Sequence, residues 1–382
     1  MTAPDCVIVA GDLTPWGGMD KANYEFARYV TGTLGKRLTI VAHRVAAPLD
    51  TNPLVSWHRV PRPLGMHALG APILARAGRR FRNRGVLISN GGNCRDAALT
   101  WVHAVHAAWE PDVDAAPATV RVRARLQKAR ARRAEAAAVR AARLVVTNSN
   151  RARMQLIERL GVSESSVVTV YYGNDASLFR PVASAERSAA RRSLGWDEHR
   201  RTAIFIGALG HDRSKGFDVL LEAWKRLSRE AEWDVDLVAI GDGAAVAHWR
   251  REAETLGSRV RIEGFRTDIP MVLRAADLLI SPTRYDAYGL AVHEAMCCGI
   301  PAFVTRCAGV AERYPSNLRE LLLDDPPSVD DLAARLVAWR SDVSAIRERV
   351  RTFGTELHRR TWADMSRELA ALVDRVATEI AR

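Results

Sequence analysis

The stretch that decides the fold is Ser281-Pro-Thr-Arg-Tyr-Asp286-Ala-Tyr-Gly289-Leu-Ala-Val-His-Glu294-Ala-Met-Cys-Cys-Gly299-Ile-Pro301. It follows the largely apolar run 277–280 and precedes another at 302–305, and both runs are typical of buried strands. Residues 290–298 between them favour a helix, which Gly299 and Pro301 would end. The pattern therefore predicts strand, loop, helix and strand, the repeating unit of a doubly wound parallel sheet.

The loop of this unit is expected to bind a ligand. In a doubly wound sheet such loops open at the carboxyl ends of the strands, where ligands bind. A helix that begins near Gly289 presents unpaired N–H groups and a positive dipole end, which favour an anion. If the anion is the phosphate part of a nucleotide, the carboxylates of Asp286 in the loop and Glu294 in the helix are placed to bind its neighbours. One could reach a polar group beyond the phosphates and the other a ribose. The alternative is that Asp286 only caps the helix and that Glu294 lies on a solvated helix face.

The same stretch resembles the donor signature of the retaining glycosyltransferases of family 4, which have the GT-B fold. Their pattern reads S-x4-E-G-F-G-L-x3-E-A-M-A-x-G-x-P. The matching positions are Ser281, Gly289, Leu290, Glu294, Ala295, Met296, Gly299 and Pro301. Asp286 replaces the usual first Glu and Tyr288 the usual Phe. The resemblance implies that Asp286 holds sugar hydroxyls, that Glu294 holds the ribose, and that Tyr288, Gly289 and Leu290 border the donor.

A second strand exit carries cations. The predicted strand 202–206 leads to Gly207 and then to Arg213 and Lys215 ahead of a predicted helix. Arg can grip two phosphate oxygens at once, and Lys supplies a point charge. This loop resembles the family's G-R-x(4–6)-K-G, with Ala208 at the usual Arg position, so Arg213 is expected to take over its role. The resemblance implies that both cations neutralise a leaving diphosphate, and that Gly207 and Phe265, the latter after the predicted strand at 260, lie at the donor.

The first half of the chain is expected to face the transferred sugar. Gly17 and Gly18 follow the predicted first strand 6–10 and open a helix, and they resemble the family's first glycine loop. A strand beginning at Thr100 is predicted to carry His103 and His106 on opposite faces. Family members place a His at the end of this strand beside the sugar. The resemblance favours His106 for that role, with His103 as the second choice, whereas a lone strand histidine is more often a core residue.

Composition bounds the class of protein. The 382 residues suffice for two domains, and the chain has no apolar run near the roughly 20 residues that cross a bilayer. The N-terminus lacks the pattern of a signal peptide, and the five cysteines lack metal-type spacing, which predicts a cytoplasmic protein. The pair Asp234-Val-Asp236 matches a metal-binding spacing but falls within a predicted strand, so no metal site is expected.

The net charge of +12 is concentrated in two segments, Arg62–Arg84 and Arg121–Arg143. Such segments suit nucleic acid, an anionic membrane or a phosphorylated substrate, and equally the exposed face of an Ala/Arg-rich helix. Zinc spacing, aromatic stacking motifs and a helix-turn-helix signature are not found in the sequence, so nucleic acid is not expected. Peripheral binding to the inner face of the cell membrane, through Arg76–Arg84 and Arg121–Arg143, is a hypothesis.

Taken together, the sequence predicts an α/β protein of GT-B type, with two doubly wound, Rossmann-like domains facing across a cleft. The expected domains are 1–180 and 181–361, with the C-terminal helix 362–382 crossing back to the first. The resemblance implies a metal-independent hexosyltransferase that moves a sugar from a nucleotide-diphosphate sugar, such as a UDP- or GDP-sugar, to a hydroxyl acceptor, with no separate cofactor. A non-catalytic binding protein on the same scaffold and a Rossmann oxidoreductase or epimerase are the alternatives, and the latter lacks a full G-x-G-x-x-G near the start.

Overall fold

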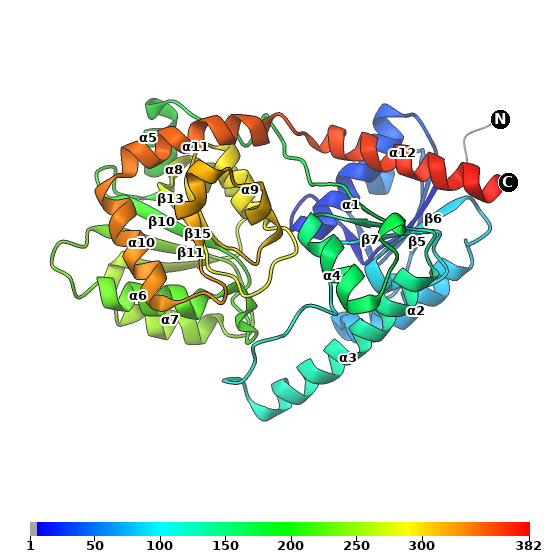
Figure 1. Ribbon diagram of the computed structural model, residues 1–382, viewed down its shortest axis with the longest axis horizontal. Coiled ribbons are helices and arrows are strands. Elements are labelled where there is room, and N and C mark those ends of the chain that lie inside the picture. Colours follow the sequence, from blue (N-terminus) through cyan, green and yellow to red (C-terminus); the bar gives the residue numbers. More distant parts are fainter. Residues whose placement is uncertain (1–5) are drawn as a thin grey trace. The chain divides into compact units, whose positions relative to one another are not determined.

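The computed structural model describes residues 6–382 as two compact units, each built on a parallel sheet with helices packed around it (Figure 1). Unit 1 comprises residues up to Trp109, Arg123–Gly173 and Arg360–Arg382. Unit 2 comprises Glu110–Val122 and Asn174–Arg359. The observed division differs from the expected domains because the chain enters unit 2 after Gly173, seven residues before the predicted boundary, and because 110–122 belongs to unit 2.

Unit 1 contains a seven-stranded parallel sheet. Its strands lie in the order β5 (Val55–Arg59), β3 (Leu38–Ala42), β1 (Cys6–Val9), β6 (Val86–Asn90), β7 (Leu99–Val102), β8 (Leu144–Thr147) and β9 (Val167–Thr169). A separate two-stranded sheet pairs β2 (Asp12–Leu13) with β4 (Arg44–Val45). The helices are α1 (Gly18–Arg28), which continues as a π-helix at Tyr29–Thr33, α2 (His67–Arg79), α3 (Ala118–Ala141), α4 (Asn150–Leu160) and α12 (Trp362–Ala381). The first five residues of α3, 118–122, belong to unit 2. Helix α12 packs against α1, which returns the end of the chain to unit 1.

Unit 2 contains a six-stranded parallel sheet. Its order is β12 (Val260–Gly264), β11 (Val235–Ile240), β10 (Arg201–Ile206), β13 (Leu278–Ser281), β14 (Ala302–Thr305) and β15 (Leu322–Leu323). The helices are α5 (Ser184–Leu194), α6 (Phe217–Leu227), α7 (Val246–Glu254), α8 (Ile269–Ala275), α9 (Leu290–Cys297), α10 (Val329–Ser341) and α11 (Val343–His358). Because β10 is flanked by β11 on one side and β13 on the other, the strand order reverses there, and the loops that leave β10 and β13 open at the switch point.

Apolar runs explain most of this architecture. Central strands such as β1 and β11 are buried along their whole length, because helices cover both faces of a parallel sheet and leave no solvent-facing side. Strand β5 was not predicted, since as an edge strand it keeps Ser56, His58 and Arg59 exposed and so lacks such a run. The prediction that His106 lies in a strand is wrong, because β7 ends at Val102 and His106 follows in a turn.

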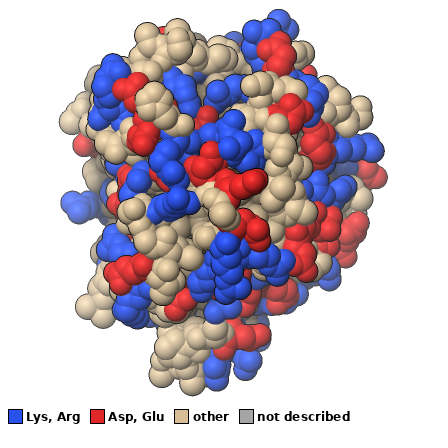
Figure 2. Space-filling model, turned by 90° about the vertical axis from the view of Figure 1, so that its left-hand side faces the viewer, with Lys and Arg blue, Asp and Glu red and all other residues tan. Residues whose placement is uncertain are grey.

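Charged side chains cover the face of unit 2 that carries α5, α6 and α10, with acidic and basic groups interspersed (Figure 2). Ion pairs account for much of this pattern, among them Arg335 with Asp331 at 2.6 Å and Arg340 with Asp234 at 2.5 Å. Asp236, the other acid of the Asp-x-Asp spacing, pairs with Arg200 at 2.7 Å. Both acids of that spacing are therefore engaged by arginines.

Candidate active site

Two loops of unit 2 come together where the strand order reverses. Residues 207–216 leave β10 and residues 282–289 leave β13. The Thr283 hydroxyl donates to the Ser214 carbonyl at 2.7 Å, and the Arg284 amide donates to the same carbonyl at 2.7 Å. The two predicted ligand-binding loops are thus hydrogen-bonded to each other.

Gly216 permits this close approach. Its φ of 71° lies in the left-handed region, and a Cβ built there would stand 1.7 Å from the carbonyl oxygen of Pro282. Any other residue would push the two loops apart. The glycine therefore fixes the distance between Lys215, which precedes it, and the loop that carries Asp286.

Lys215 and Asp286 form an ion pair, with Nζ and Oδ2 2.6 Å apart. The two side chains keep 35% and 22% of their surface exposed, so solvent or a ligand has access to both. Lys215 was predicted from one motif to bind the diphosphate, and Asp286 from another to bind the sugar. The structure places the two side chains in direct contact.

Arg213, the other predicted cation, begins a short 3₁₀ turn, Arg213–Lys215, capped by Asp212, whose carboxylate accepts from the Ser214 amide at 3.0 Å. The Arg213 guanidinium lies 3.8 Å from Asp218. Arg213 and Lys215 thus occupy the same turn, which follows the predicted Gly207 at the exit of β10.

Sequence reasoning missed Arg284. Its guanidinium makes two hydrogen bonds to Asp218, at 2.8 and 2.7 Å, and a third to the Arg213 carbonyl at 2.8 Å. The hydrogen bonds that Arg284 donates to Asp218 raise the pKa of the guanidinium above its already high value, so the group is charged throughout the working range. Arg284 lies inside the stretch that resembles the donor signature, at a position where the family pattern allows any residue. A cation at that position was the one feature of the sequence that could have pointed to it.

Helix α9 begins at the loop's end with Gly289 as its N-cap, at φ 101°. A Cβ at this position would lie 2.9 Å from Val310, so glycine is required both for conformation and for space. The amides of Val292 and His293 donate to the Gly289 carbonyl, at 3.1 and 3.2 Å, and those of Leu290 and Ala291 precede this first intrahelical acceptor. Glu294 lies in the second turn and is buried. The start of α9 therefore supplies donors suited to an anion.

Tyr288 and Phe265 differ in their access to a ligand. The Tyr288 ring is buried and its hydroxyl bonds to His293 Nδ1 at 2.6 Å, so in this arrangement the ring supports the loop and is closed to a ligand. Phe265 follows β12 and is 61% exposed, which leaves its ring open to solvent.

In unit 1, Glu135 of α3 holds the turn that contains His106. The fully buried carboxylate accepts from the amides of His106 and Ala107, each at 2.9 Å, and lies 3.2 Å from His106 Nδ1. The His106 ring remains partly exposed while its Nδ1 edge is fixed. Glu135 is the one acid in the basic segment 121–143, and the sequence alone gives no sign of this role.

His103 is a core residue. It lies directly after β7, between the rings of Trp101 and Tyr172, and its Nδ1 is 2.5 Å from the Tyr172 hydroxyl. Burial lowers the pKa of His103 to about 3, so the ring is neutral at ordinary pH. Of the two histidines considered, only His106 keeps a solvent-accessible ring.

The glycines Gly17 and Gly18 begin α1, with Gly17 as the N-cap. Asp20 in the first turn of this helix lies near Asp12, which itself pairs with Arg62 at 2.6 Å and Arg44 at 3.2 Å. Burial first, and then the charge of Asp12, raise the pKa of Asp20 to about 6. The glycine loop thus adjoins a cluster of acids and arginines at the carboxyl ends of the unit 1 strands.

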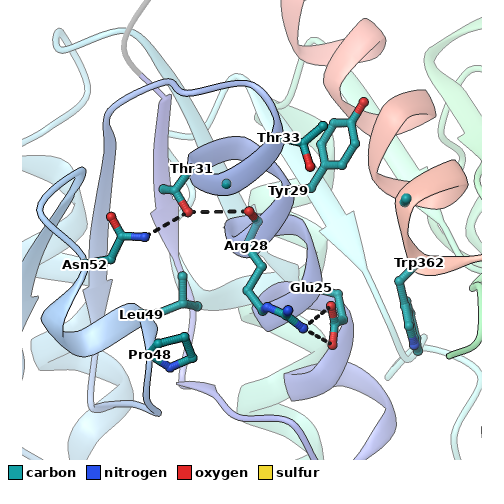
Figure 3. Close-up of a pocket in the computed structure, with 11 residues that line it drawn as sticks. Glu25, Arg28, Tyr29, Thr31, Thr33, Pro48, Leu49, Asn52 and Trp362 are labelled. Carbon is teal, nitrogen blue, oxygen red and sulfur yellow. Dashed lines mark hydrogen bonds and ion pairs between the residues drawn. The ribbon is translucent and has the colours of Figure 1, made fainter. Parts of the chain in front are cut away.

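A further pocket of unit 1, of about 370 Å³, is lined by the end of α1, the π-helix, the 49–52 turn and the start of α12 (Figure 3). Glu25 and Arg28 form an ion pair along its wall at 3.2 Å, and Asn52 and Leu49 stand opposite. The predicted site residues of unit 1, Gly17, Gly18 and His106, are absent from its lining.

Comparison with solved structures establishes the class of fold. The Anabaena protein HepE, crystallised in complex with UDP-glucose, is similar over 97% of this chain and 99% of its own, with a TM-score of 0.75 and 19% identity. The sucrose-phosphate synthase of Thermosynechococcus elongatus is similar over 98% and 99%, with a TM-score of 0.75 and 16% identity. The chain therefore has the GT-B fold, as predicted from its sequence.

A family model matches a segment of unit 2. Residues 200–342 match the family model described as glycosyl transferases group 1, which confirms the predicted resemblance for this segment. The D-inositol 3-phosphate glycosyltransferase of Thermobifida fusca is 30% identical over 230 residues, 56% of this chain and 52% of its own length. The mannosylfructose-phosphate synthase of Agrobacterium fabrum is 28% identical over 232 residues, 57% and 50%. The chain spans about half the length of these curated relatives.

Proposed function

We propose that this protein is a retaining glycosyltransferase that moves a hexose from a nucleotide-diphosphate sugar to a hydroxyl acceptor without a metal ion. The observation that carries the proposal is the convergence of Lys215, Asp286 and the N-terminus of α9 on two hydrogen-bonded loops of unit 2. Cations and helix amides beside a carboxylate match a ligand with an anionic diphosphate and a hydroxylated sugar.

The roles follow from charge. Negative charge develops on the leaving diphosphate as the sugar–phosphate bond breaks, and Arg213, Lys215 and the start of α9 would stabilise it. Removing one preorganised donor of this kind typically costs about 3–4 kcal/mol of barrier. Asp286 would hold sugar hydroxyls and Glu294 the ribose. His106, fixed by Glu135, would contact the sugar or the acceptor hydroxyl.

The donor is identified first by a thermal-shift panel of UDP-, GDP-, ADP- and TDP-sugars, and we expect a UDP- or GDP-sugar to stabilise the protein. Turnover with that donor is then followed by nucleoside diphosphate release, with and without EDTA, and the anomer of the product is read by NMR. Lys215→Ala and Glu294→Ala should each lower turnover sharply while the circular dichroism spectrum persists. Stabilisation by a donor with no turnover on any acceptor would favour a sugar-nucleotide binding protein instead.

We also propose that helices α2 and α3 contact an anionic membrane surface. None of the helices within residues 6–382 is long and apolar enough to cross a bilayer. Helix α2 exposes Leu69 and Ile73 near Arg76 and Arg79, and α3 exposes Val122 and Leu126 among its arginines. Apolar side chains set among cations suit the interface of an anionic leaflet. Sedimentation with vesicles of phosphatidylcholine, with or without phosphatidylglycerol, tests this, and equal recovery with both vesicles at low salt would refute it.

A further inference from the structure

The turn that carries Arg213 and Lys215 is short, and a turn of three residues does not fix the direction of two long cationic side chains by itself. A diphosphate site needs such cations held in place, because preorganised charges stabilise a transition state better than mobile ones. The question is which residues hold the turn.

Asp112 holds it on one side through its main chain. The Arg213 amide donates to the Asp112 carbonyl at 2.9 Å, and the Asp112 amide donates to the Asp212 carboxylate at 3.0 Å. Asp212 is the residue that caps the turn. Asp112 lies in the segment Glu110–Val122, which belongs to unit 2 although the chain on both sides of it belongs to unit 1.

Arg284 holds the turn on the other side through its side chain. Its Nη1 donates to the Arg213 carbonyl at 2.8 Å, its Nη1 and Nη2 bond both oxygens of Asp218, and its Nε lies 3.3 Å from Asp112 Oδ2. A guanidinium has five N–H donors in a rigid fork, so one side chain can serve all of these acceptors. Because the fork is occupied by Asp218, Arg284 is placed to orient its neighbours and not to grip a phosphate.

We propose that the segment around Asp112 is part of the donor site, and that Asp112 and Arg284 are positioning residues that aim Arg213 and Lys215 at the diphosphate. This inference rests on the proposed function. It also links the two candidate centres along the chain, because Asp112 lies only six positions after His106. Residues 107–111 are then the covalent connection between the sugar-side histidine and the diphosphate turn.

Calorimetric titration with UDP and UMP, or with GDP and GMP if the guanosine donor binds, tests the inference. In Arg284→Gln the Kd of the diphosphate should rise about tenfold, as expected for losing a bidentate charged contact, while that of the monophosphate changes less than about twofold. Arg284→Lys should fall between, because it keeps the charge and loses the fork. The matched control is Arg340→Gln, which breaks another two-bond pair with an aspartate of unit 2, at 2.5 and 2.7 Å, and should leave both Kd values unchanged.

Equal weakening of diphosphate and monophosphate would overturn the inference, because it would show a general loss of structure. So would a diphosphate Kd in Arg284→Gln equal to that of the control. If Arg284→Gln fails to fold, Asp112→Ala tests the inference in its place, because it removes only the side-chain contact to Arg284. This variant should raise the diphosphate Kd about threefold, and an unchanged Kd would overturn the inference. Failure of the wild-type protein to bind every nucleotide tested would instead refute the proposed function on which the inference rests.

Discussion

Asp286→Asn should strengthen the binding of a bare nucleoside diphosphate and weaken catalysis of sugar transfer. In the structure Asp286 Oδ2 and Lys215 Nζ are 2.6 Å apart, so a diphosphate must draw Lys215 away from this carboxylate. Both groups are partly exposed, and a pair of this kind contributes about 1 kcal/mol. Removing the negative charge should therefore tighten the binding of a bare nucleoside diphosphate about fivefold.

The same substitution should slow sugar transfer. A carboxylate that accepts hydrogen bonds from sugar hydroxyls contributes about 1.5–3 kcal/mol, and its replacement should lower kcat/KM about 10–100-fold. Calorimetry with UDP and a chromatographic assay of UDP-sugar consumption measure the two effects. In a Lys215→Ala background the gain in UDP affinity should vanish, because the gain acts through Lys215. An Asp286→Asn variant that binds UDP no more tightly than the wild type would refute this reasoning.

Three further outcomes are expected. Gly216→Ala should abolish detectable nucleotide binding because its Cβ meets the Pro282 carbonyl, whereas Gly195→Ala, at a similar φ of 66° with open space around it, should cost only about 1 kcal/mol of stability in a urea titration. Glu135→Gln should lower the free energy of unfolding by about 1–3 kcal/mol and reduce kcat, because the buried carboxylate accepts two main-chain amides of the His106 turn; unchanged unfolding would contradict this. The raised pKa of Asp20 means that the folded protein favours its protonated form, so stability should fall as pH rises from 3.8 to about 6, and Asp20→Asn should flatten that fall in melting temperatures recorded from pH 4 to 8.

Much of the fold could be predicted from the sequence because the strands of both sheets are buried apolar runs. The predicted strand 302–305 has the observed bounds of β14, and the predicted strands 202–206 and 6–10 match β10 and β1 within one residue. Helix α9 was placed within one residue by its stop signals. Edge strand β5 was not predicted, because exposed and partly buried residues are mixed along it and leave no apolar run.

The candidate site was predictable only in part. Motif spacing pointed to Lys215 and Asp286, and the structure places them in contact, but their roles toward a donor stay predictions. Arg284 and Glu135 were missed, since each acts through partners far away in the chain. Glu135 bonds residues 28 and 29 positions earlier, and Arg284 bonds an aspartate 66 positions earlier. One sequence carries no record of such pairings.

The assignment of Glu110–Val122 to unit 2 has a consequence for protein engineering. A hybrid that joins the first part of this chain to a foreign second part at a single point would separate 110–122 from 174–359. A junction near residue 174 in this chain would leave the Asp112 contacts to the Arg213 turn dependent on a foreign residue. A hybrid intended to keep the proposed donor site intact should therefore carry 110–122 together with 174–359, as two inserts rather than one.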